Sequence, residues 1–137
     1  MDPADFLNVS SRLYNSGFEE DRRTSISRSY YALYLVLHLD LRAQGVQFTN
    51  TGRDHGWLVH GLMTCLDANA YRIGQELKNR QADRIKADYR MNATIDVARS
   101  EFAYKSARAM VNLYRGLNAA NLATIVQAIK NVAPPPP

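Results

Sequence analysis

The stretch from Arg22 to Leu41, which reads RRTSISRSYYALYLVLHLDL, constrains the fold of this chain more than any other segment. Its apolar residues recur every three or four positions: Ile26, Tyr30, Leu33, Leu37 and Leu41. This spacing is typical of one face of an α-helix. In the second half of the stretch, apolar residues surround almost the whole helix axis. We therefore expect a helix enclosed by other helices, or by a second copy of the chain.

The other apolar patterns in the chain are also helical, and no strand pattern or internal repeat is present. Five further helices are expected, over about residues 3–14, 54–66, 70–90, 95–117 and 122–129. Asp54 is expected to cap the third helix, and the fifth helix is expected to pack through Ala98, Phe102, Ala109 and Leu113. The predicted fold is an all-α, up-and-down bundle of four main helices with short terminal additions. Residues 1–133 form one predicted domain, followed by a disordered proline tail at 134–137.

Length and cysteine content indicate a chain with its own core in a reducing compartment. With 137 residues, the chain can bury a substantial core without disulfides. Its single cysteine, Cys65, lies among apolar residues and is interpreted as a reduced core residue. The N-terminus lacks a secretory pattern, and the most apolar run, residues 30–41, is shorter than the roughly 20 residues that span a bilayer. We expect a cytoplasmic protein with no membrane association.

The basic residues are strongly biased towards arginine. The formal net charge is +4, and arginine outnumbers lysine by 13 to 4. The planar guanidinium matches phosphate and stacks on bases, so this bias favours RNA contact. A genome rich in G and C, together with an ordinary solvated surface, explains the same composition, and this alternative stays open.

The standard signatures of cofactor, nucleophile and zinc sites are absent from the sequence. His55 and His60 are five residues apart, which points them to different sides of a helix, so no metal is expected. No cofactor is expected either. His38 lies within the apolar helix and is interpreted as a hydrogen-bonded core histidine.

The predicted fourth helix carries the best candidate for a chemical site. Arg80, Arg84 and Asp88 are spaced by four residues, and Tyr89 follows directly. An arginine, a carboxylate and a phenol on one side of a helix could hold a phosphate and orient a hydroxyl. The alternative is an exposed Arg84–Asp88 ion pair, which stabilises a helix by only about 0.3 to 0.5 kcal/mol. The residues expected to contact RNA or phosphate are Arg80, Lys86 and Arg90.

Two motifs together resemble those of the HEPN superfamily. Ser27-Arg28-Ser29-Tyr30-Tyr31-Ala32 is similar to the S-R-A-Y-Y-A run of the second HEPN helix. The segment Arg84-Ile85-Lys86-Ala87-Asp88-Tyr89 resembles the R-x-x-A-D-Y motif of a largely uncharacterised bacterial and archaeal branch. The His55-Gly56 pair also matches a pair common there, so the resemblance extends from Phe6 to Leu117.

This resemblance implies a helical bundle that forms a homodimer, often encoded beside a nucleotidyltransferase or within a prokaryotic defence system. Many HEPN domains cleave RNA without a metal, using an arginine followed after four to six residues by a histidine. Here Arg84 matches the arginine, but Tyr89 stands where the histidine would be. Arg53 and His60 have the same kind of spacing, which we interpret as accidental.

Three functional hypotheses follow from the sequence. The first is a dimeric HEPN-like protein of a toxin-antitoxin or antiviral system that cleaves RNA with Arg84, Asp88 and Tyr89. The second is a non-catalytic module that binds RNA or a protein, with a nucleotidyltransferase antitoxin or another defence protein as its partner. The third is a domain that binds small nucleotides in a cleft of the bundle. Because tyrosine, with a pKa near 10, is a poor base near neutral pH, all three stay open.

Overall fold

The computed structural model describes residues 1–132, and every regular element within them is helical. A short 3-10 turn at Pro3–Asp5 precedes six α-helices: α1 (Phe6–Leu13), α2 (Glu19–Ala43), α3 (Arg53–Thr64), α4 (Ala68–Tyr89), α5 (Val97–Arg115) and α6 (Ala119–Asn131). This confirms the predicted all-α class. The predicted proline tail at residues 134–137 lies outside the described residues.

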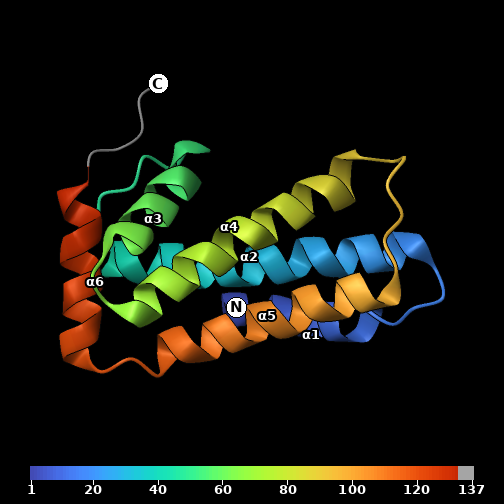
Figure 1. Cartoon of the computed structure of the whole chain (residues 1–137). Coiled ribbons are helices and arrows are strands. Elements are labelled where there is room, and N and C mark those ends of the chain that lie inside the picture. Colours follow the sequence, from blue (N-terminus) through green and yellow to red (C-terminus); the bar gives the residue numbers. More distant parts are fainter. Residues whose placement is uncertain (133–137) are drawn as a thin grey trace.

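Helix α2 is the central element of the bundle. It packs against α1, α4 and α5, which run beside it along the length of the molecule (Figure 1). Helices α1 and α4 run in the direction opposite to α2 and α5, as in an up-and-down bundle (Figure 1). Helix α3 leads through a short connection into α4 and packs against it, and α6 packs on α3 across one end of the bundle (Figure 1).

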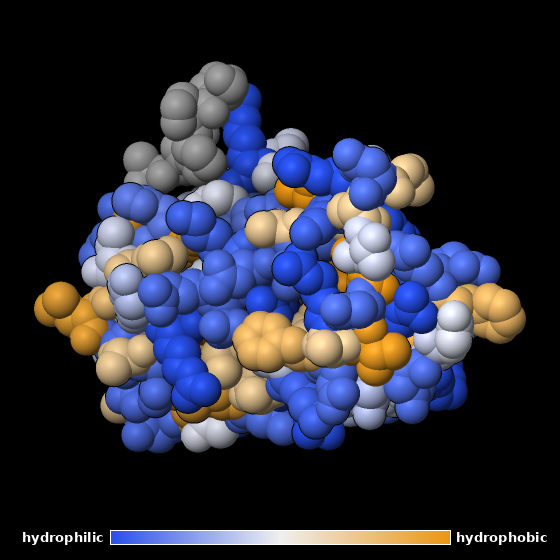
Figure 2. Space-filling model, turned by 45° about the vertical axis from the view of Figure 1, so that its right-hand side comes forward, coloured by the Kyte–Doolittle hydropathy of each residue, from blue (hydrophilic) through white to orange (hydrophobic). Residues whose placement is uncertain are grey.

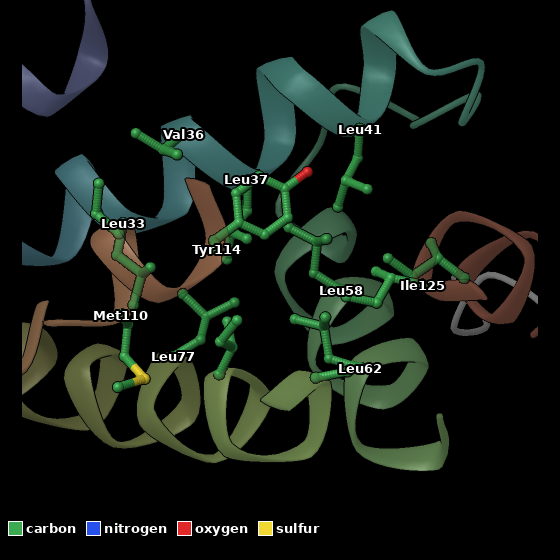
Figure 3. Packing of buried hydrophobic residues seen from close by; sticks show 14 of the residues in the cluster. Leu33, Val36, Leu37, Leu41, Leu58, Leu62, Leu77, Met110, Tyr114 and Ile125 are labelled. Atoms are coloured by element: carbon green, nitrogen blue, oxygen red, sulfur yellow. The ribbon is translucent and has the colours of Figure 1, made fainter. Parts of the chain in front are cut away.

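The core is built around the second half of α2, as its sequence predicts. Leu33, Leu37 and Leu41 are completely buried and point towards side chains of α3, α4 and α5 (Figure 3). Enclosure of α2 is nevertheless incomplete, because Leu39 is 46% exposed. The face of the molecule in Figure 2 is mainly hydrophilic with scattered hydrophobic residues, as expected when most apolar side chains are used internally.

Two polar or weakly polar residues of the apolar segments are buried, as predicted. Cys65 is 8% exposed at the end of α3, and His38 is 7% exposed in α2. The Nε2 atom of His38 lies 2.9 Å from a carboxylate oxygen of Asp54, which satisfies the buried imidazole. None of the helices within residues 1–132 is both long enough and apolar enough to cross a membrane.

Three helices begin at side chains that satisfy their first amide groups. Asp67 accepts a hydrogen bond from the amide of Ala70, Asp96 from that of Arg99 and Asn118 from that of Asn121. Because Asp67 is the cap, α4 begins at Ala68, two residues before its predicted start. The prediction that Asp54 caps α3 is wrong, since this residue lies in the first turn and binds the preceding loop instead.

The crossings of α3 with α6 and with α4 depend on two glycines. A Cβ atom on Gly61 would lie 2.7 Å from a side-chain carbon of Ile129 and 3.0 Å from its Cα atom. A Cβ atom on Gly74 would lie 2.8 Å from a side-chain carbon of Met63. Any larger residue would push these helices apart, so both glycines permit the close approach that sets the position of α3.

The prediction for the buried face of α5 is wrong. Ala98, Phe102 and Ala109 are exposed, and Leu113 is only half-buried. The buried face contains Ser100, Ala103, Ala107, Met110, Val111 and Tyr114. Its first half is made of small residues, which allow close packing, and the Ser100 hydroxyl donates to the carbonyl of Tyr14 at 2.6 Å. The bulky Phe102 is left outside, where it covers a buried arginine of α4.

Candidate functional site

Arg84 of α4 is held among tyrosine rings. Its side chain is only 15% exposed. The guanidinium carbon lies 5.4 Å from the ring centre of Tyr30, 5.7 Å from that of Tyr31 and 5.8 Å from that of Tyr89. These distances fit cation–π contacts, which orient a charged group without using its hydrogen-bond donors. Together with His55 and Asp88, these side chains form what we name the Arg84 cluster: Tyr30, Tyr31, His55, Arg84, Asp88 and Tyr89.

The hydrogen-bond donors of Arg84 are largely unused. Its Nη1 atom is 3.7 Å from a carboxylate oxygen of Asp88, which is an ion pair but too long for a good hydrogen bond. Its Nε atom is buried without a hydrogen-bond partner among residues 1–132. Asp88 accepts a further bond of 3.3 Å from the hydroxyl of Ser27. The predicted pair therefore exists, but Arg84 is mostly buried, and its guanidinium makes only a long contact with the carboxylate.

His55, from the first turn of α3, joins this arrangement. Its Nδ1 atom is 2.8 Å from the hydroxyl oxygen of Tyr30, and its ring centre is 5.7 Å from that of Tyr30. Burial lowers the pKa of His55 to about 4, and the positive charge of Arg84 acts in the same direction. The imidazole is thus neutral at pH 7. Sequence reasoning did not place His55 in the site; the only signal was the His55-Gly56 pair.

The hydroxyl of Tyr30 is protonated at neutral pH, because burial and the neighbouring Tyr34 raise its pKa. The Tyr30–His55 contact can form in either direction, since a hydroxyl both donates and accepts. When Nδ1 carries the proton and donates it to Tyr30, the Nε2 atom of His55 keeps its lone pair. In that tautomer His55 can act as a base.

Asp54 determines where His55 lies. Its carboxylate accepts hydrogen bonds from the backbone amides of Thr49 and Asn50, both at 2.8 Å, and contacts the imidazole of His38 at 2.9 Å. These contacts join the loop before α3 to the buried side of α2. Asp54 itself is completely buried. It therefore fixes the start of α3, and with it the neighbouring His55, against Tyr30 of α2.

The structure brings only some of the predicted residues together. Asp88 and Tyr89 lie beside Arg84, and Tyr89 is 70% exposed at the edge of the cluster. Lys86 and Arg90 follow Arg84 by two and six residues, which at about 100° per residue turns them to other sides of α4. Arg80 is 4% exposed and faces Phe102 of α5. It is therefore placed to support Phe102 from the buried side.

The cluster offers phosphate-binding and proton-transfer groups, but no metal site. Within residues 1–132, no three histidine, cysteine, aspartate or glutamate side chains gather as a metal ion would require. The fold and the cluster together define an all-α helical protein with a tyrosine-bound arginine beside a neutral histidine. No protein-family model, curated protein or solved structure matches the chain.

The lowered pKa of His55 predicts how the stability of the protein depends on pH. Between about pH 4 and 6.5 the unfolded chain binds a proton at this residue that the folded chain does not. The free energy of unfolding should therefore rise with pH in this window, by at most about 1.4 kcal/mol per pH unit from this group. Urea unfolding at pH 4.5 and 6.5 should show a smaller difference for His55→Gln than for the wild-type protein.

The matched control for this experiment is His60→Gln, because His60 is an exposed histidine of the same helix. This variant should keep the wild-type pH dependence. An unchanged pH dependence in His55→Gln would contradict the assignment of a buried, neutral imidazole.

Proposed function

We propose that this chain is a HEPN-like protein of a prokaryotic toxin-antitoxin or antiviral system that binds RNA at the Arg84 cluster and cleaves it without a metal. One observation carries the proposal. Arg84 is oriented by three tyrosine rings, its Nε atom has no hydrogen-bond partner, and its ion pair with Asp88 is long; the neutral His55 contacts the same Tyr30 ring as Arg84. This is the pairing that RNA cleavage needs: a cation for the phosphate and a base for a hydroxyl.

The proposed reaction is an attack of the ribose 2′-oxygen on the adjacent phosphorus. His55 takes the proton of the 2′-hydroxyl, and Arg84 stabilises the negative charge that develops on the phosphoryl oxygens. The bond from phosphorus to the 5′-oxygen breaks, and that oxygen takes a proton from the Tyr89 hydroxyl. The proton gained by His55 then passes through water to Tyr89, which restores both groups. The products are a 2′,3′-cyclic phosphate and a 5′-hydroxyl. The proposed base is thus His55, because position 89, where the HEPN motif would have its histidine, is a tyrosine.

A homodimer is part of the same proposal, because the resemblance implies two such sites facing one groove. Helix α4 supports it with two exposed side chains of apolar character at the edge of the Arg84 cluster. Ile85 is 37% exposed and Tyr89 is 70% exposed, and they lie one helical turn apart. A second copy could cover these residues and bring its own Arg84 cluster to the same groove.

A non-catalytic module is the second candidate function, and the tyrosine at position 89 favours it. Arg84 would still bind an RNA phosphate, but no reaction would follow. The module would then hold RNA without cleaving it, or bind a protein partner such as a nucleotidyltransferase antitoxin. Binding of RNA in this case should weaken steeply as the salt concentration rises.

The proposal is tested by incubating the purified protein with end-labelled RNA in the presence of EDTA. Cleavage that leaves 2′,3′-cyclic phosphate ends is expected. Tyr89→Phe removes the hydroxyl of the proposed general acid and should slow cleavage by at least about 10²-fold. Tyr71→Phe is the matched control, because Tyr71 is an exposed tyrosine of the same helix, and it should cleave at the wild-type rate.

Other outcomes of this experiment separate the two candidates. Intact RNA with salt-sensitive binding would favour the non-catalytic module. A protein that neither cuts nor binds RNA would contradict the ribonuclease and the RNA-binding module, and would favour a module that binds a protein partner.

A further inference from the structure

Phe102 of α5 is a large aromatic side chain that the fold leaves 61% exposed. It stands between two hollows of the surface. One hollow has a volume of about 380 Å³ and is lined by Arg80, Asp83, Asp96, Arg99 and Phe102. The other has a volume of about 270 Å³ and reaches Phe102 from the side of Arg72 and Lys105. The ring is therefore bordered by open space that a flat ligand could occupy.

Arg80 supports the inner side of the Phe102 ring. Its guanidinium carbon is 4.9 Å from the ring centre, which fits a cation–π contact. Arg80 is buried, with only 4% of its surface exposed. Its Nε and Nη1 atoms nevertheless have no hydrogen-bond partner within residues 1–132. Its Nη2 atom is 3.3 Å from Asp83. Phe102 thus rests on a buried, fixed cation, so little side-chain freedom would be lost when a ligand stacks on it.

The charges around Phe102 favour an anionic strand. The three carboxylates that line the two hollows are already engaged: Asp83 pairs with Arg80, Glu76 accepts a hydrogen bond from the Ser106 hydroxyl, and Asp96 caps α5. Arg72 and Arg99 are exposed, and neither forms an ion pair with another described residue. An aromatic ring flanked by such arginines is the arrangement that binds single-stranded nucleic acid, with bases on the ring and phosphates on the cations.

We propose that Phe102 is a stacking platform for an unpaired nucleobase, with Arg99 and Arg72 placed to contact the neighbouring phosphates. This subsite lies towards α5, whereas the Arg84 cluster lies towards α2 and α3. The proposal rests on the proposed function in taking RNA as the ligand, but stacking itself needs no cleavage. The base can belong to an RNA strand or to a free nucleotide, and the test separates these two sources.

The test uses Phe102→Trp, which places a fluorescent ring at the platform. The wild-type protein is the reference, because its single tryptophan, Trp57, is 6% exposed and donates to the carbonyl of Ile129. Saturable quenching of Phe102→Trp by an octamer of adenylate RNA is expected, with little change in the wild-type signal. Ribose 5-phosphate carries the phosphate but no base and should not quench.

The affinity of the same octamer provides the second measurement. Phe102→Ala should bind about 5- to 150-fold more weakly, which corresponds to the contribution of about 1–3 kcal/mol from one stacked base. Phe18→Ala is the matched control, because Phe18 is 66% exposed at the start of α2, and it should bind like the wild type. Every protein in both titrations, including the reference with the wild-type residues at 18 and 102, carries His55→Ala, so that the RNA stays intact.

The outcomes distinguish this proposal from the proposed function. Quenching by adenosine monophosphate that is as strong as by the octamer supports the platform and assigns it to free nucleotides. Quenching by RNA together with an inactive wild-type protein supports the platform and contradicts the ribonuclease. No quenching of Phe102→Trp, with unchanged affinity in Phe102→Ala, overturns the platform even if the wild-type protein cleaves RNA.

Discussion

Replacing Asp54 with alanine is expected to lower the free energy of unfolding by about 3–5 kcal/mol, as measured by urea denaturation at pH 7. The carboxylate is completely buried. Its removal leaves the amides of Thr49 and Asn50 and the imidazole of His38 without their acceptor. Buried groups that lose their partner bear the full cost of desolvation, which is why the effect should be large.

The free energy of unfolding of the wild-type protein should also depend on pH through the carboxylate of Asp54. Burial acts to raise the pKa of Asp54, but hydrogen bonds from Thr49, His38 and Asn50 outweigh it, and the net pKa is lowered. The stabilisation by Asp54 is therefore present above the ordinary carboxyl pKa of 3.8 and is lost as the pH falls through the lowered value.

Two variants control for the loss of a carboxylate in general. Asp54→Asn keeps an acceptor oxygen and should lose less stability than Asp54→Ala. Asp5→Ala removes an exposed carboxylate and should change stability by less than about 0.5 kcal/mol. A loss below about 1 kcal/mol in Asp54→Ala would show that the loop before α3 is not held in the way described here.

The second large effect is expected at Arg84. If the proposed ribonuclease activity is present, Arg84→Ala should reduce the rate of RNA cleavage by about 10²–10³-fold, the effect of removing one group that stabilises transition-state charge. Arg84→Lys keeps the charge but loses the planar group that lies among Tyr30, Tyr31 and Tyr89. Its cleavage rate should therefore lie between those of the wild-type protein and Arg84→Ala. Thermal unfolding of each variant separates this effect from a loss of folded protein.

Histidine variants then identify the proposed base. His55→Ala should slow cleavage by about 10²–10⁴-fold. His60→Ala, on the exposed side of the same helix, should leave the rate unchanged. Because the pKa of His55 is about 4, the wild-type rate should stay high down to about pH 5 and fall only below it. Full cleavage by both Arg84→Ala and His55→Ala would remove the Arg84 cluster from the reaction.

The residues of this site that lie on α4 could be predicted from the sequence, and those on other helices could not. The pattern around Arg84, Asp88 and Tyr89 depends on positions within α4, and helical geometry alone brings such neighbours together. His55 and Tyr30 are 25 residues apart in the chain and meet only because the fold places the first turn of α3 beside α2. No periodicity within one segment reports a contact of that kind.

Helix α5 shows a second limit of sequence reasoning. Its apolar residues lie on several sides, so the pattern did not select one face. Packing against the neighbouring helices determined which face of α5 is buried. Small residues such as Ala103 and Ala107 allow close packing, whereas Phe102 covers the buried Arg80 from outside.

The sequence by itself determined the all-α class, the buried role of the segment from Arg22 to Leu41, and the position of the Arg84 motif on a helix. These properties depend on local spacing, which the chain carries whatever its partners are. Only the tertiary structure decided that Arg84 lies among tyrosine rings with its Nε atom unpaired, that His55 joins it, and that Phe102 is exposed. Each of these depends on contacts between segments far apart in the chain, where burial and charge act through space.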